Sequence, residues 1–256
     1  MSLRSKTVMV VAAAAVIVVG VVFAVSQVIF MRSFQSLENT NTTRAVEQVT
    51  SVLSDRINSL NTLNHDWAAW DDTYNFVQHP MQNVNYVQVN PTDTTFASAG
   101  LNYIIIIDTT GYLVYGKAFD LKENKEIPIP DNLIQNFFNS TLLDHSTVED
   151  SVSGIMLLPE GPVLVSSQPI ITSQGQGPIM GTIIMAQYLD STVTDTLSKT
   201  AHLPLDVVTV DDRNMPSEYK IALSSFSASA PVFTHILNSK SIEGYTLLND
   251  IYGKPA

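Results

Sequence analysis

The sequence contains no cysteine. A disulfide scaffold, a thiol nucleophile and a cysteine-ligated zinc site are therefore all excluded. Basic residues are also scarce, since 13 Lys and Arg face 24 Asp and Glu, for a net charge of −11. An acidic body repels polyanions, so we expect neither a nucleic-acid partner nor binding to an anionic lipid surface.

Motifs of known catalytic chemistry are absent as well. The sequence has no P-loop, no dinucleotide fingerprint, no G-x-S-x-G and no H-E-x-x-H. The histidines are dispersed, without the close spacing that a metal site requires: His65, His79, His145, His202 and His235. We therefore predict no enzymatic activity, no metal and no cofactor. A tethered hydrolase would need a nucleophile and a base that the sequence does not bring together.

One long apolar run lies near the N-terminus. Val8–Val25 has no charged residue, and its apolar character continues to Phe30. About 23 residues in a helix rise about 34 Å, enough to cross a hydrocarbon core of roughly 30 Å. A cleavable signal peptide is the alternative, because Ala24-Val25-Ser26 could be a cleavage site, although such peptides have apolar runs of only about 7–15 residues. We predict membrane insertion through residues 8–30.

This interpretation divides the chain into a transmembrane anchor over residues 1–31 and a body over residues 32–256. Arg4 and Lys6 precede the span, and Arg32 and Arg44 follow it, so the positive-inside rule favours a cytoplasmic N-terminus only weakly. We expect a single span in the cell membrane with the acidic body extracytoplasmic.

Proline and glycine are missing between Arg32 and Pro80. Within this window apolar residues recur every three or four positions from Val46 to Val77, which is typical of a long helix that packs along its length. The pattern predicts a stalk helix over residues 43–78, along which we expect a homodimer. Asp72 could instead cap a second, short helix, and the polar residues 38–43 could interrupt the helix before it.

The remaining sequence predicts an α+β domain with a mostly antiparallel sheet and short helices. Strands are expected over residues 101–108, 112–119, 154–158, 163–172, 179–189, 205–210 and 242–251, and helices over 90–100, 131–143, 190–199 and 216–223. Residues 122–130 are expected to form a loop. Tyr252–Pro255 has the composition of a hairpin turn whose second strand is missing, which indicates a C-terminally incomplete domain.

His65–Gln78 holds both tryptophans of the chain among several acidic residues. On a helix, Trp67, Trp70, Asp71 and Tyr74 fall along one side, so the Asp71 carboxylate is drawn towards an aromatic face. A carboxylate in that position needs a partner. The segment is therefore either a structural hub, in which the protein supplies that partner, or a ligand-binding site.

An ordered set of motifs resembles a known family. Asp66-Trp67 and Trp70-Asp71-Asp72-Thr73-Tyr74 are its most specific part, followed by Ile107-Asp108, Gly111 and Val114-Tyr115-Gly116 in a strand-turn-strand arrangement. Gly161-Pro162 and Gly177–Thr182 come next. Together they resemble the fourth class of the CHASE family of extracellular sensor domains, which occur in prokaryotic membrane receptors ahead of histidine kinase or cyclic-nucleotide signalling modules.

The resemblance implies a sensor with a PAS- or Cache-like sheet behind a long N-terminal helix. We therefore predict an extracytoplasmic domain of a histidine-kinase-type receptor in a two-component system, with an unidentified small molecule as its ligand. The predicted ligand-binding residues are Trp67, Trp70, Asp71, Asp72, Tyr74, Asp108 and Tyr115. A membrane-tethered interaction or adhesion domain without a ligand is the alternative.

Overall fold

The computed structural model describes residues 3–227, 230–238 and 241–256. Side chains are not described for residues 3–13, 28, 30–36 and 131. The chain divides into two compact units. One comprises Met1–Glu47 and Val232–Tyr245, and the other comprises Gln48–Pro231 and Thr246–Ala256.

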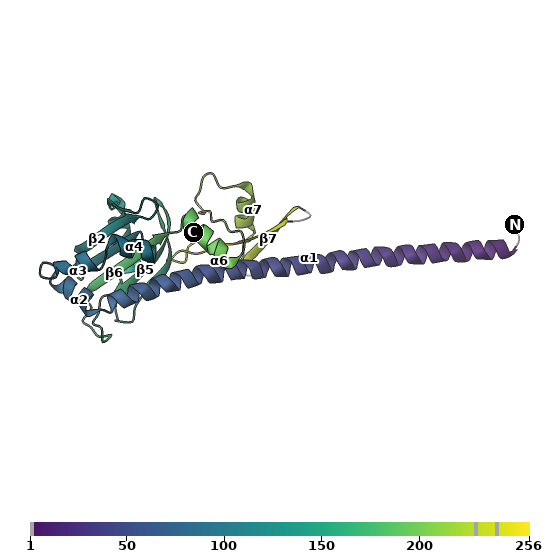
Figure 1. The fold of residues 1–256 in the computed structure, drawn as a ribbon. Helices are drawn as coiled ribbons and strands as arrows, with labels where there is room; N and C mark the ends of the chain where they lie inside the picture. Colours follow the sequence, from purple (N-terminus) through teal and green to yellow (C-terminus); the bar gives the residue numbers. More distant parts are fainter. Residues whose placement is uncertain (1–2, 228–229, 239–240) are drawn as a thin grey trace. The chain divides into compact units, whose positions relative to one another are not determined.

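A single helix, α1, runs from Leu3 to Ala68 and is followed by the short helix α2, Asp71–Gln78 (Figure 1). The continuous stalk helix predicted over residues 43–78 is therefore wrong, because α1 ends at Ala68, and the alternative of a second short helix is confirmed. However, Trp70 is its N-cap residue, with extended backbone angles (φ −132°, ψ 128°), and Asp72 lies in the first turn. Acidic residues in a first turn interact favourably with the helix dipole. The interruption considered over residues 38–43 is absent, because α1 is continuous there.

A six-stranded sheet forms the centre of the larger unit, in the order β3-β2-β1-β6-β5-β4. Every neighbouring pair is antiparallel, which confirms the predicted α+β class. The strands are β1 (Tyr103–Asp108), β2 (Leu113–Asp120), β3 (Lys125–Ile127), β4 (Val152–Leu158), β5 (Gly161–Pro169) and β6 (Gly181–Tyr188). The central strands β1 and β6 are almost entirely buried, in keeping with their β-branched sequences.

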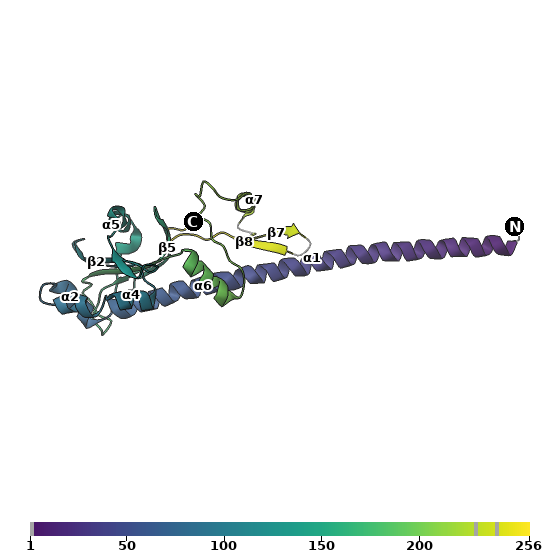
Figure 2. The ribbon, with the colours of Figure 1, turned by 45° about the horizontal axis from the view of Figure 1, so that its top comes forward.

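Helices cover both faces of this sheet (Figure 2). The C-terminal part of α1 shares one core with Ile104, Ile106 and Met185, together with residues of α2 and α6 (Ser191–Ala201). On the opposite face, α5 (Asp131–Phe138) inserts Leu133 and Phe137 into a second core. Because side chains alternate along a strand, five of the six strands contribute to both cores, while the edge strand β3 contributes only Ile127 to the second core.

Shorter helices complete this unit. They are α3 (Val84–Val89), α4 (Asp93–Ala99), the 3-10 helix η1 (Thr141–Leu143) and α7 (Ser217–Ser225). Helices are present where they were predicted, over 90–100, 131–143, 190–199 and 216–223. Each predicted range is either too long or displaced from the observed helix. The turn at residues 252–255 folds back on itself, since Asp250 N donates to Lys254 O at 2.8 Å.

One strand prediction is wrong, one is too long, and two strands were not predicted. Residues 205–210 carry no strand in the structure, although Leu205 and Val207 do pack against the core. The predicted loop over residues 122–130 contains β3, a short charged strand at the sheet edge. The strand predicted over 242–251 is present as the shorter β8 (Ser241–Thr246), and it pairs with β7 (Val232–Asn238), which was not predicted.

The smaller unit brings the β8 glycine Gly244 close to α1. A Cβ atom at Gly244 would lie 2.6 Å from Thr42 Cγ2 and 2.7 Å from Val46 Cγ2. Distances of this kind are too short for a side chain, so glycine permits this close packing. Within the same unit Thr234 Oγ1 donates to Asn39 Oδ1 at 3.2 Å.

Much of the predicted anchor lies outside the residues whose side chains the structure describes. Within the searched part of the chain, no helix has the length and apolar character needed to cross a membrane. The span over residues 8–30 and the division at residue 31 stay predictions.

Candidate functional site

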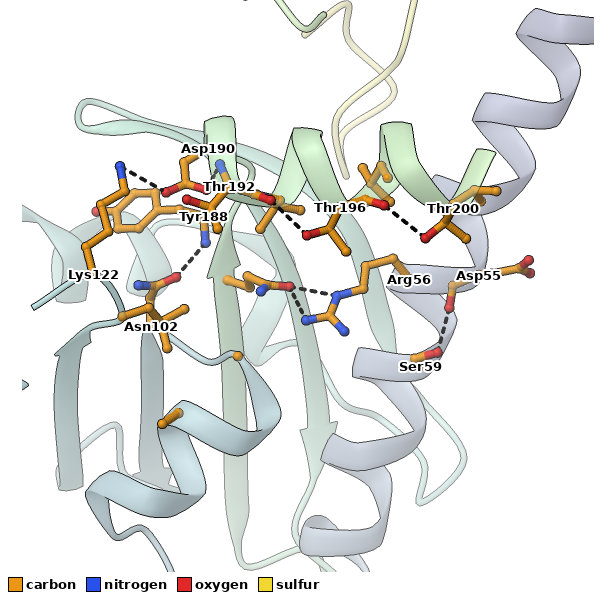
Figure 3. Close-up of a pocket in the computed structure, with 17 residues that line it drawn as sticks. Asp55, Arg56, Ser59, Asn102, Lys122, Tyr188, Asp190, Thr192, Thr196 and Thr200 are labelled. Carbon is orange, nitrogen blue, oxygen red and sulfur yellow. Dashed lines mark hydrogen bonds and ion pairs between the residues drawn. The ribbon is translucent and has the colours of Figure 1, made fainter. Parts of the chain in front are cut away.

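A cavity of about 600 Å³ opens in the larger unit, bounded by α1, α4, α6 and the end of β6 (Figure 3). Cavities of this volume are typical of small-molecule sites. Apolar side chains from three segments form part of its wall: Val52, Leu121, Val193 and Leu197. Polar side chains converge on it from α1, the β2–β3 turn, β6 and the start and body of α6: Arg56, Lys122, Gln187, Asp190, Thr196 and Thr200.

The half-buried Arg56 projects from α1 into this cavity. Its Nε and Nη2 both donate to Gln187 Oε1, at 2.8 and 2.6 Å. Burial lowers the pKa of the Arg56 guanidinium, as expected when a charge leaves water. None of the ion pairs in the described part of the chain includes Arg56, so its charge is held by a neutral amide.

Gly100 forms the part of the cavity wall next to this guanidinium. It ends α4 in the left-handed conformation (φ 70°) that favours glycine. A Cβ atom at Gly100 would lie 3.0 Å from Arg56 Nη2 and 2.9 Å from Gln187 Nε2. The glycine therefore both ends the helix and leaves room for the Arg56–Gln187 pair.

The second cation of the cavity has an acidic partner. Lys122 Nζ lies 3.5 Å from Asp190 Oδ2. The other oxygen of Asp190 accepts from Thr192 N at 2.9 Å and from Val193 N at 3.1 Å, so this carboxylate also caps α6. The Asp55 carboxylate points away from Arg56 (Figure 3).

Helix α6 presents a line of threonines to the cavity. Thr192, Thr196 and Thr200 are spaced four residues apart, so they lie on one side of the helix (Figure 3). Thr196 Oγ1 donates to Thr192 O, and Thr200 Oγ1 donates to Thr196 O, both at 2.9 Å. Because the hydroxyl protons are used in these bonds, the oxygens face the cavity mainly as hydrogen-bond acceptors.

None of the seven sequence-predicted ligand residues lines this cavity. Trp67, Trp70 and Tyr74 are partly buried and pack against the core between α1 and the sheet. The Trp70 ring centroid lies 6.1 Å from that of Tyr86. A structural hub at this segment is therefore present, while a ligand-binding role for the three aromatic residues stays a prediction.

Asp71 is exposed in the structure, so its carboxylate does not lie in a buried aromatic face as the sequence suggested, although the protein does supply a partner for it. Its Oδ1 accepts from Ser173 N, and its own N–H donates to Ser173 Oγ, both at 2.9 Å. Asp72 is exposed in the first turn of α2. This reciprocal pair joins the start of α2 to the loop after β5, so the protein itself satisfies Asp71.

The two hairpin residues lie apart from the cavity. Asp108 Oδ1 accepts from Thr110 N, Thr110 Oγ1 and Tyr112 N, at 2.8, 2.7 and 2.9 Å. Burial opposes ionisation of Asp108, but these hydrogen bonds outweigh it and hold its pKa below the ordinary value. Burial likewise raises the pKa of Tyr115, which packs against the same core as Trp70.

Arg56 was missed because charged residues on a predicted stalk are usually solvated. One signal could have found it. Arg56 is the single Lys or Arg between Arg44 and Lys117, and it lies between the apolar positions Leu53 and Ile57 of the stalk pattern. A cation at the border of a buried stripe is a candidate for a half-buried position.

Sequence comparisons identify a matching family and a relative of this chain. The CHASE4 domain model matches residues 52–208. The methanogenesis regulatory histidine kinase FilI of Methanothrix harundinacea (strain 6Ac) is 32% identical over 175 residues, which is 68% of this chain and 20% of FilI. The chain thus spans one fifth of the length of that relative.

A solved sensor structure has a similar fold. The extracellular domain assigned to the histidine kinase vpHK1S-Z8 superposes with a TM-score of 0.55 at 14% identity, covering 86% of this chain and 93% of that domain. For the periplasmic domain of Vibrio cholerae LuxQ the TM-score is 0.48 at 13% identity, covering 84% and 95%. The family match over more than half of the chain is decisive: the chain belongs to the CHASE4 domain family.

Proposed function

We propose that this chain is the extracytoplasmic ligand-sensing part of a membrane-bound signal-transduction receptor of the histidine-kinase type. Membership of the CHASE4 family and the relationship to the histidine kinase FilI support this proposal. The ligand is a small molecule, and it occupies the cavity between α1, α6 and the end of β6.

The observation that carries the proposal is that α1 forms one wall of the cavity. Val52, Arg56 and Ser59 of α1 face side chains of α6 and β6 across the cavity, which has a volume of about 600 Å³. A ligand that contacts both sides more strongly in one arrangement than in another shifts the equilibrium between them. Because α1 is a single helix from Leu3 to Ala68, a displacement at Arg56 is carried towards the N-terminus.

A thermal-shift screen tests the ligand-sensing function. The purified full chain is heated with members of a library of small metabolites. A ligand present at 100 times its Kd stabilises the fold by about 2.7 kcal/mol, which for a domain of this size raises Tm by several degrees. If no metabolite raises Tm, the sensor proposal fails in favour of a tethered interaction or adhesion domain.

We also propose that the N-terminal segment anchors the chain and that the body is extracytoplasmic. Large apolar side chains on α1 support the anchor, since Val16, Val19 and Phe23 are 64–72% exposed and apolar surface of this kind is stable in lipid. The absence of native cysteine allows a direct test. In intact cells a membrane-impermeant maleimide should label Glu160→Cys, on the β4–β5 turn, and should leave Ser5→Cys unlabelled. The reverse pattern would contradict this topology.

A homodimer along α1 is part of the same proposal. Oxidative crosslinking of Ser51→Cys, at an exposed position on α1, should give a covalent dimer in membranes. Failure of Ser51→Cys and of a second exposed variant, Ser54→Cys, to crosslink would contradict a dimer along this helix. The absence of enzymatic activity stays a prediction from the sequence.

A further inference from the structure

We infer that the cavity takes a small organic monoanion, a carboxylate, whose charged group pairs with Arg56. This inference rests on the proposed sensing function and names the chemical class of its ligand. Three features of the cavity carry it: an uncompensated guanidinium, a second cation that is already neutralised, and walls that are apolar or offer hydrogen-bond acceptors.

The guanidinium has free donor capacity. Arg56 carries five N–H groups, of which two donate to the single oxygen Gln187 Oε1. The three remaining N–H groups, two on Nη1 and one on Nη2, have no hydrogen-bond partner in the described part of the chain. A half-buried charge whose partner is one amide oxygen is poorly compensated. A carboxylate matches the planar donor geometry of a guanidinium and would supply the missing charge.

The neighbouring charges indicate a single anionic group. Lys122, the other cation of the cavity wall, already faces Asp190 at 3.5 Å. Asp190 in turn is engaged at the start of α6, and the Asp55 carboxylate points away from Arg56 (Figure 3). One unpaired positive charge thus remains, and a dianion would leave one of its charges without a partner.

The rest of the wall fits an organic body rather than an inorganic ion. Val52, Val193 and Leu197 provide apolar surface, and the cavity volume of about 600 Å³ is far larger than one carboxylate requires. Thr196 and Thr200 add acceptor oxygens on the opposite side. The ligand class that satisfies all these groups is a small carboxylic acid with an apolar part, with room for a hydroxyl or amide donor facing α6.

The test compares charged probes with neutral probes of the same shape. Acetate, butyrate, hexanoate and benzoate, each beside its amide, are titrated into the purified full chain by calorimetry. At least one carboxylate should bind with one site per chain, and its amide should bind at least tenfold more weakly. Equal binding of an acid and its amide, or no binding by any of the four acids, would overturn the inference.

Two substitutions assign the charge to Arg56. Arg56→Gln should weaken carboxylate binding at least tenfold, whereas Lys122→Gln, which removes a cation that is already paired, should change it less than threefold. Gln187→Glu is the second test, because it gives Arg56 an internal carboxylate at the position of the present amide. That variant should abolish carboxylate binding and should raise Tm, so loss of the fold is not an alternative explanation.

Unchanged binding in both Arg56→Gln and Gln187→Glu would overturn the inference. A different result would contradict the sensing function itself. If a neutral metabolite from the thermal-shift screen stabilises the full chain while none of the acids binds, the anion assignment is wrong and the sensor proposal stands. If no compound of either set binds, both are wrong.

Discussion

The side-chain amide of Asn64, on α1, donates to the backbone carbonyl oxygen of Ile183 in β6 at 3.1 Å and to that of Ser166 in β5 at 2.9 Å. Asn64 is completely buried. Neighbouring Asn61 accepts from Gln168 Nε2 at 2.8 Å, so polar contacts run along this side of the helix. Such buried bonds fix the register of α1 on the sheet, because a displaced amide would lose them.

We expect Asn64→Ala to lower the free energy of unfolding by about 2 kcal/mol, since it removes buried hydrogen bonds and leaves a void. Urea denaturation of the full chain measures this change. Asn58→Ala is the matched control, because Asn58 is exposed on the same helix, and it should alter stability by less than about 0.5 kcal/mol. Equal effects of the two substitutions would contradict the proposed role of Asn64.

Trp70→Ala should destabilise the fold by about 3 kcal/mol, at the lower end for a large aromatic residue because Trp70 is only partly buried. The reason is loss of packing against the core, including Tyr86. Tyr112→Ala serves as control, since the Tyr112 side chain is 69% exposed. If Trp70→Ala instead abolishes ligand binding and leaves the unfolding free energy unchanged, the ligand lies at the aromatic segment.

Two substitutions of Asp108 should lower stability to different extents. Asp108→Ala removes the acceptor of three hydrogen bonds and should cost about 1 kcal/mol, whereas Asp108→Asn keeps an acceptor oxygen and should cost less. Because the pKa of Asp108 is lowered in the fold, its contribution is present above pH 3.8 and is lost as the pH falls below that value. The stability of Asp108→Asn, measured by denaturation, should lack this loss at low pH. If Asp108→Asn and the wild-type chain lose stability equally as the pH falls, the assignment to Asp108 is wrong.

Tyr86 predicts alkaline destabilisation. Burial raises its pKa from 10.0 to about 12, against the opposing hydrogen bond with Thr73. Between these pH values the unfolded chain loses the Tyr86 proton while the folded chain retains it, so stability falls as pH rises. By linkage, the fall between pH 10 and pH 12 amounts to about 2 kcal/mol for this residue. Tyr86→Phe should have a shallower slope of unfolding free energy between pH 10 and 12, and an equal slope would refute the assignment.

The sequence pattern was sufficient for the parts of the fold with strong local signals. The β-branched run before Asp108 and the turn at Gly111 predicted the β1–β2 hairpin, whereas the cap of the second helix was placed at Asp72, two residues after the observed N-cap Trp70. Strand β3 was missed because Lys125–Ile127 is short, charged and at the sheet edge, so pairing with β2 rather than residue type makes it a strand. The opposite error at residues 205–210 arose from apolar residues that are partly buried without strand pairing.

The aromatic segment was visible in the sequence, whereas the cavity was not. Trp67 and Trp70 are conspicuous in the sequence because they are the only two tryptophans of the chain, and in the structure both pack against the core. The cavity depends on Arg56, Gly100 and Gln187, which come from three distant segments. Their meeting is set by sheet order and by the register of α1, which local periodicity does not contain.

The most direct measurement is ligand binding by a chain whose cavity has been filled. Ala97 lines the cavity from α4 and is exposed, so Ala97→Trp should fill the space while leaving the core intact. The metabolite that raises the Tm of the wild-type chain should fail to raise the Tm of Ala97→Trp and should still raise that of Trp70→Ala. Retained stabilisation of Ala97→Trp, together with loss in Trp70→Ala, would contradict the cavity as the sensing site.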